Sequence, residues 1–154
     1  MHLRFKITDM RAKYKREFKT AIEKAYAFKD GAAFYYGRND YPHATFMLHQ
    51  FIELALTAIE VLFIRKPFRT HHIKLHLRYI SEQIPLIQLG FPTVAEDELR
   101  LVNLLDKSYI AVRYRSLYVI EKEQIDTFLR WVHNLERRIT DIYESDFGID
   151  EALN

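Results

Sequence analysis

The residues best suited to chemistry are a histidine and a glutamate four positions apart in an otherwise apolar stretch. His49 and Glu53 share one face of any helix that contains them. An imidazole and a carboxylate are costly to bury without partners, so they either bond each other or Glu53 bonds an arginine from another helix. Arg113 is the candidate arginine. Two interpretations stay open: a core ion pair that sets helix register, or a polar pocket near the end of a bundle.

A second candidate is a run of cations around a predicted helix N-terminus, a position that favours anions through its dipole. No acidic residue interrupts the run, which comprises Arg65, Lys66, Arg69, His71, His72, Lys74, His76 and Arg78. We expect part of this run to lie with Arg113 and Arg115 near one end of the bundle and to bind phosphate. The residues are Arg65, Lys66, Arg69, His71 and Lys74. A solvated basic face is the alternative.

Several other chemistries lack the residues they need. The chain has no Cys, which excludes disulfides, thiolate zinc sites, iron–sulfur clusters and cysteine nucleophiles. It has no glycine-rich phosphate loop and no Glu with a His three residues later, as di-iron bundles require. His72 and His76 could share a helix face as metal ligands, but no third ligand is evident. We therefore expect no metal and no cofactor.

The elements that must position these residues are helical. The 154 residues fit one domain, and only 4 Gly and 4 Pro argue against a turn-rich β fold. Apolar residues at spacings of three and four predict helices over about residues 8–36, 42–64, 71–83, 93–114 and 125–143. The second is apolar nearly all round and should be the most buried. We expect an all-α, up-and-down antiparallel bundle of about five helices.

Charge is distributed unevenly along the chain. Residues 1–38 hold ten Lys/Arg against four Asp/Glu, and residues 121–154 hold four against nine. This complementarity predicts that the first and last helices lie close together. The most apolar run, Leu54 to Ile64, is too short to span a bilayer and contains Glu60. With no secretory signal, we expect a cytoplasmic protein without membrane association.

Three segments together resemble the HEPN domain family. The segment Ala44 to Glu53 resembles the family's signature helix, Thr70-His71 its Thr-His pair, and Tyr109 to Tyr114 its Tyr-x-x-x-Arg-Tyr motif. The resemblance places the core at about residues 28–145 of a single domain spanning residues 1–154. It is closest to the HEPN half of bacterial proteins that fuse a minimal nucleotidyltransferase to a HEPN domain. The nucleotidyltransferase motif, Gly-Ser followed by Asp-x-Asp, is absent here.

The resemblance implies a homodimer that binds nucleotides or RNA, often beside a nucleotidyltransferase partner. Many HEPN proteins are metal-independent ribonucleases with an Arg followed four to six residues later by a His. No His follows Arg113 at that spacing, and Tyr118 is a poor replacement base. We therefore predict a non-catalytic binding module, with a ribonuclease using an unconventional base and a purely dimerising module as alternatives. The predicted phosphate-binding residues are His49, Glu53, Arg69, His71, Lys74, Arg113, Tyr114 and Arg115.

Overall fold

The computed structural model describes residues 2–85, 87–91, 96–114 and 117–147. Across these residues the chain is helical, without a strand, which confirms the all-α prediction. A short π-helix follows the last α-helix. The elements are α1 (His2–Gly37), α2 (Tyr41–Ile64), α3 (Ile73–Gln83), α4 (Glu96–Tyr114), α5 (Lys122–Ile142) and the π-helix η1 (Tyr143–Phe147).

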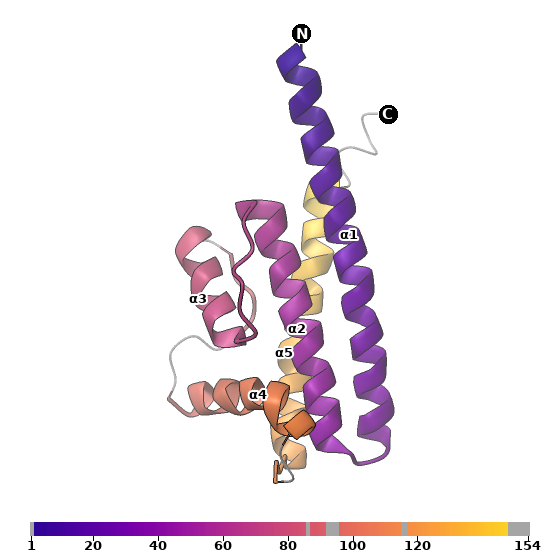
Figure 1. Ribbon diagram of the computed structural model, residues 1–154, viewed down its shortest axis with the longest axis vertical. Coiled ribbons are helices and arrows are strands. Elements are labelled where there is room, and N and C mark those ends of the chain that lie inside the picture. The colour runs from indigo at the N-terminus through magenta and orange to yellow at the C-terminus, as the bar shows by residue number, and fades with distance from the viewer. Residues whose placement is uncertain (1, 86, 92–95, 115–116, 148–154) are drawn as a thin grey trace.

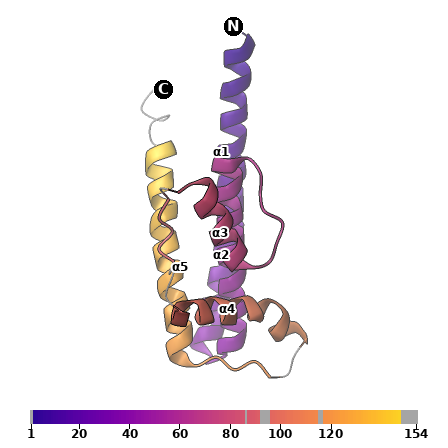
Figure 2. The same ribbon diagram turned by 90° about the vertical axis from the view of Figure 1, so that its left-hand side faces the viewer.

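The helices are arranged around α2, which contacts each of the other four α-helices. α1 and α2 form an antiparallel hairpin (Figure 1). α4 lies across the end of the molecule where that hairpin turns, and α5 then runs alongside α2 in the same direction as α2 (Figures 1 and 2). The predicted antiparallel arrangement therefore holds for α1 and α2. α5 runs parallel to α2, and this is possible because α4 crosses the end of the molecule before α5 begins.

The local sequence explains the bounds of α2. The Asp40 side chain accepts a hydrogen bond from the His43 backbone N–H at 3.3 Å, and Pro42 occupies the first turn. Arg65 ends the helix in the left-handed conformation, with φ of 66°. Taken whole, α2 is long and apolar enough to cross a membrane, but 56% of its most apolar stretch is buried inside the protein. That burial is the pattern of a core helix.

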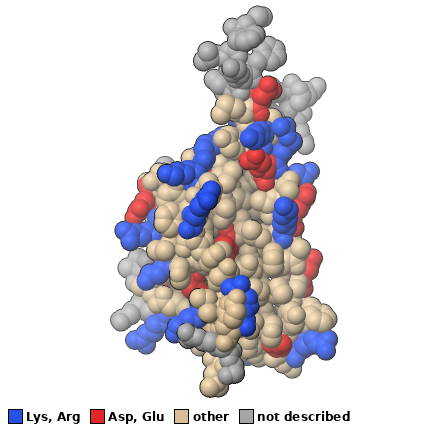
Figure 3. Space-filling view, in the orientation of Figure 1, with Lys and Arg blue, Asp and Glu red and all other residues tan. Residues whose placement is uncertain are grey.

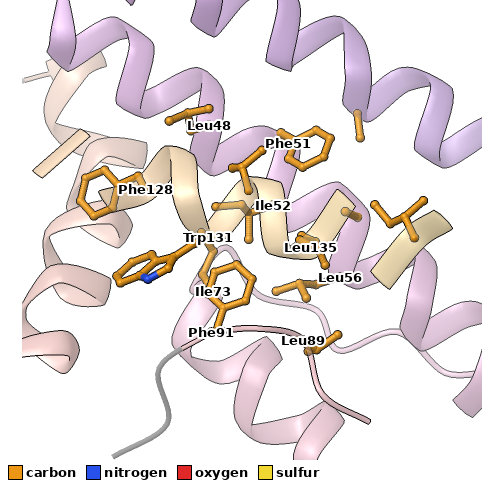
Figure 4. Close-up of a cluster of buried hydrophobic side chains, with 14 of the residues drawn as sticks. Leu48, Phe51, Ile52, Leu56, Ile73, Leu89, Phe91, Phe128, Trp131 and Leu135 are labelled. Atoms are coloured by element: carbon orange, nitrogen blue, oxygen red, sulfur yellow. The ribbon is translucent and has the colours of Figure 1, made fainter. Parts of the chain in front are cut away.

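The core lies between α2 and α5 (Figure 4). Phe51 and Leu56 of α2 and Phe128 of α5 are fully buried. The segment 87–91 adds Leu89 and Phe91, both almost completely buried. This segment is held along α5 because Asn134 donates to the Gly90 carbonyl at 3.0 Å and Arg138 donates to the Gln88 carbonyl at 2.7 Å.

Several predicted helix ends shift by a few residues. α3 begins at Ile73 rather than His71, since the Thr70 hydroxyl accepts from the His72 N–H at 3.1 Å in a turn that precedes the helix. α5 begins at Lys122, where Glu121 and Gln124 form a capping box. Residues 93–95, where the fourth helix is predicted to begin, lie outside the described residues.

The predicted closeness of the first and last helices is confirmed by polar contacts. Lys29 of α1 donates to Glu136 of α5, and the Tyr36 hydroxyl donates to Asp126 at 2.8 Å. Burial and the Glu136 carboxylate raise the pKa of Tyr26 to about 12, which keeps this phenol protonated between the two helices.

Candidate functional site

A polar stripe crosses the otherwise apolar α2. His49, Glu53 and Glu60 fall on one helix face because they are spaced by four and seven residues. The face meets the segment 65–72, which follows α2 and leads to α3. Two histidines outside α2 bond the two glutamates of the stripe: His71 contacts Glu53 and His76 contacts Glu60. The stripe therefore holds the connection between α2 and α3.

The outer His–Glu pair belongs to a solvent-facing group that we call the Tyr109 cluster, comprising Glu53, His71, Tyr109 and Arg113. His71 Nδ1 donates to Glu53 Oε1 at 2.9 Å, since an ionised carboxylate can only accept. The His71 ring stacks on the Tyr109 ring at a centroid distance of 4.2 Å and an angle of 13°. Arg113 Cζ lies 4.1 Å from the centre of the same ring. The cluster thus places an imidazole and a guanidinium on one aromatic side chain.

Exposure separates the members of the Tyr109 cluster. The side chain of His71 is 59% exposed and that of Glu53 only 15%. Arg113 is also exposed, and its Nε donates to the Tyr109 carbonyl at 2.8 Å one turn earlier. Tyr114 is 75% exposed, with its ring 5.3 Å from Arg113 Cζ. The histidine and the arginine are therefore open to a ligand while the glutamate that orients the histidine is shielded.

A buried layer supports the cluster from below. His49 is fully buried, and its Nδ1 faces the Gln50 side-chain amide at 3.1 Å. Because that amide nitrogen donates, the proton of His49 sits on Nε2, which donates to the His71 carbonyl at 2.9 Å. His49 therefore positions the backbone of His71, and does not present a free nitrogen to a ligand.

Asp106 of α4 is a site residue that sequence reasoning missed. Its carboxylate accepts from the N–H groups of Ile73 at 2.7 Å and Lys74 at 3.3 Å, so it caps α3 from another helix. Its Oδ1 also lies 3.4 Å from Nε2 of His49. No local pattern reveals this role, because the capping residue lies more than thirty positions away in sequence.

The inner His–Glu pair is a second missed feature. His76 and Glu60 are both essentially inaccessible to solvent, with Nδ1 and Oε1 2.6 Å apart. His76 Nε2 donates to the Thr70 carbonyl at 3.1 Å, and Glu60 also accepts from the Phe68 N–H at 2.8 Å. Burial alone lowers the pKa of His76, but the hydrogen bond and charge of Glu60, with the Thr70 carbonyl, raise it above its usual value.

This arrangement bears on the metal hypothesis. Both ring nitrogens of His76 are engaged, whereas His72 is exposed and approaches Asp106 at 4.0 Å. Within the described part of the chain, no group of three or more His, Asp or Glu side chains is arranged to hold a metal ion. Tyr118 likewise offers no base: its hydroxyl donates to the Leu104 carbonyl at 2.6 Å, and burial raises its pKa.

Of the two partners predicted for Glu53, Arg113 is wrong, whereas His49 lies beside Glu53, with His49 Nδ1 3.7 Å from Glu53 Oε2. Glu53 bonds His71 and is shielded, whereas Arg113 is exposed and packs on Tyr109. The reason is that the segment 65–72 runs back over α2 and places His71 at the Glu53 carboxylate, in the position that Arg113 was expected to occupy. Arg113 is left to interact with the aromatic rings around it, including Phe46 at 5.9 Å.

The prediction that the cations gather at one end is also wrong. Arg65 lies beyond the last turn of α2 and packs on Tyr14 of α1 at 3.8 Å, whereas Arg113 lies beside Phe46 in the second turn. Figure 3 shows Lys and Arg scattered over the face rather than concentrated. Arg69 and Lys74 are exposed outside the Tyr109 cluster, and Arg115 lies outside the described residues.

The helical fold and the Tyr109 cluster together define an all-α domain with an open polar site between α2, the segment 65–72 and α4. The family model for the HEPN domain matches residues 18–142, which is most of the chain. The chain therefore belongs to the HEPN domain family. No curated protein matches its sequence.

Proposed function

We propose that this HEPN domain binds the phosphate of a nucleotide or RNA at the Tyr109 cluster. The observation that carries the proposal is the packing of exposed His71 and Arg113 on one tyrosine ring. The Arg113 guanidinium, held over this ring, offers a planar set of donors that suits phosphate. The exposed ring of Tyr114 next to Arg113 offers a surface on which a base can stack.

We also propose that the domain works as a homodimer beside a minimal nucleotidyltransferase partner. Apolar side chains near the cluster support an interaction surface: Ile110 and Tyr114 lie on one face of α4 and are 51% and 75% exposed. Leu117 and Val119 follow at 86% and 67%. Adjoining exposed apolar residues of this kind mark interaction sites. The nucleotidyltransferase partner rests on the sequence resemblance alone. Light scattering that gives only the monomer mass of 18.5 kDa would contradict the dimer.

A second candidate function, metal-independent cleavage of RNA, is favoured by the bond between Glu53 and His71. Glu53 holds the hydrogen on Nδ1, which leaves Nε2 of a neutral His71 free to accept a proton. In this reaction Nε2 takes the proton of a 2′-hydroxyl as its oxygen attacks phosphorus. The bond from phosphorus to the 5′-oxygen breaks, and that oxygen takes a proton from water. Arg113 offsets the charge that develops on the phosphate.

One set of titrations tests both functions. ATP and a short single-stranded RNA are titrated at low and high salt, with RNA cleavage followed on a gel. Binding through phosphate should weaken as salt rises. Arg113→Gln should lower affinity about tenfold or more, because a hydrogen bond to a charged group is worth about 1.5–3 kcal/mol. Arg137→Gln, at an exposed position of α5, is the matched control and should change little.

The His71→Gln variant separates the two functions. If the domain only binds, His71→Gln weakens affinity and no cleavage occurs in any variant. If it cleaves, His71→Gln abolishes cleavage while RNA binding through Arg113 persists. Absence of binding to both ligands at low salt would refute phosphate binding at this site and leave only an interaction module.

A further inference from the structure

A cavity separate from the Tyr109 cluster lies between α3, the segment 87–91 and the first half of α4. Its volume is about 650 Å³, within the range of small-molecule sites. The wall is mainly aliphatic, with Leu75, Leu77, Ile87, Leu89, Leu99 and Val102 among its residues. The Phe91 ring and the Gly90 backbone complete one side.

Two cationic side chains line this cavity. Lys74 and Arg78 are both exposed, both line it, and are one helical turn apart on the same face of α3. Arg78 Nε also bonds Glu82 Oε1 at 2.9 Å, an exposed pair that contributes little by itself. Among the residues whose side chains the structure describes, none with an acidic side chain lines the cavity. An aliphatic wall with cations on one side suits a ligand with an apolar body and one anionic end.

Several polar groups of the wall already have partners within the protein, which argues against a nucleobase. The Ser81 hydroxyl donates to the Arg78 carbonyl at 2.8 Å. The carbonyls of Gln88 and Gly90 accept from Arg138 and Asn134. A base buried here would leave its own donors and acceptors without partners, at a cost in affinity. A saturated chain has no such groups.

We propose that this cavity binds the acyl chain of a medium-chain carboxylate, with the carboxylate at Lys74 and Arg78. Leu99 and Val102 of α4 line the cavity about three to four turns before Arg113, so the acyl site is distinct from the Tyr109 cluster. The two are linked through α3, because Asp106 of α4 caps the backbone of Lys74. The acyl site does not depend on phosphate binding at the Tyr109 cluster.

Octanoate and 1-octanol are the probes, titrated separately into the full chain below their aggregation limits. Isothermal calorimetry gives affinity and methyl NMR reports Leu75, Leu99 and Val102. We expect octanoate to bind one site and shift these methyls, and octanol to bind more weakly. The double variant Lys74→Glu/Arg78→Glu should weaken octanoate binding about tenfold, because it removes both cations that face the carboxylate. It should leave octanol binding nearly unchanged.

Two further variants complete the test. Lys19→Glu/Lys24→Glu changes net charge equally at exposed positions of α1 and should leave octanoate binding intact. Ser81→Trp puts a bulky ring at the exposed edge of the cavity and should abolish binding of both probes without lowering the melting temperature. Equal affinities for octanoate and octanol, unmoved methyl signals, or octanoate binding that survives Ser81→Trp would each overturn the proposal. Displacement of octanoate by ATP would assign the cavity to a nucleotide instead.

Discussion

The two glutamates of the α2 stripe should respond very differently to the same substitution. Glu60 is fully buried and serves two donors, His76 Nδ1 at 2.6 Å and the Phe68 N–H at 2.8 Å. In Glu60→Gln the single amide oxygen can serve only one of them, and the new NH₂ group faces the other. Breaking a buried pair by changing one partner costs about 3–5 kcal/mol, because the remaining group stays buried.

Glu53→Gln is the matched control on the same helix face. The Glu53 partner, His71, is 59% exposed, so water replaces the lost bond. The cost should be that of one hydrogen bond, about 1 kcal/mol. For a domain of this length, each kcal/mol lowers the melting temperature by about 2–4 °C. Thermal unfolding should therefore show a loss of about 6–20 °C for Glu60→Gln and about 2–4 °C for Glu53→Gln. Equal losses, or the reverse order, would refute the assignment of the buried pair to Glu60.

The pH dependence of this pair has a definite sign. The folded pKa of His76 lies above its unfolded value, mainly because Glu60 outweighs the effect of burial. The pair's contribution to stability is therefore complete below the unfolded pKa of about 6.5 and is lost as pH rises through the folded pKa. Urea unfolding of wild type and Glu60→Gln at several pH values isolates this effect. The difference in their unfolding free energies should shrink as pH rises, and a widening difference would contradict it.

Two further substitutions test how the connections are held. Asp106→Ala removes the acceptor for the Ile73 and Lys74 N–H groups, so unfolding free energy should fall by about 0.5–2 kcal/mol and amide exchange should accelerate in the first turn of α3. Gly90→Ala should cost about 1–3 kcal/mol by chemical denaturation, because φ is +73° and a Cβ would lie 2.4 Å from the Asn134 Cβ. Gly37→Ala is its control and should not destabilise, since a Cβ there meets nothing within 4 Å.

The helices could be predicted from the sequence because each carries its own signal. Residue spacing predicts both the apolar stripe of α5 and the nearly all-apolar α2. Asp40 followed by Pro42 is typical of a helix start. The direction in which the helices run carries no such signal. It depends on the paths of the connections between helices. Distant side chains hold these connections: His49 bonds the segment 65–72, and Asn134 and Arg138 bond the segment 87–91.

In the candidate site too, the sequence indicates which residues are involved but not which of them contact each other. The family motifs single out His49, Glu53, His71 and Arg113, and the structure brings all four to one region. The alternative that pairs Glu53 with Arg113 is wrong, because the segment 65–72 doubles back over α2 and places His71 beside Glu53. Glu60 had a signal that could have found it: a carboxylate in an apolar helix needs a buried partner.

The buried groups and the exposed site are parts of one arrangement. The backbone at residues 70–71 is held from both sides, by His76 Nε2 on the Thr70 carbonyl and by His49 Nε2 on the His71 carbonyl. His76 is in turn fixed by Glu60, and the start of α3 by Asp106. These inaccessible pairs therefore position the backbone from which the exposed ring of His71 stacks on Tyr109. Loss of the bond between Glu60 and His76 should shift the backbone at residues 70–71 and so displace His71 in the Tyr109 cluster. Glu60→Gln should therefore weaken ligand binding although Glu60 does not contact the ligand.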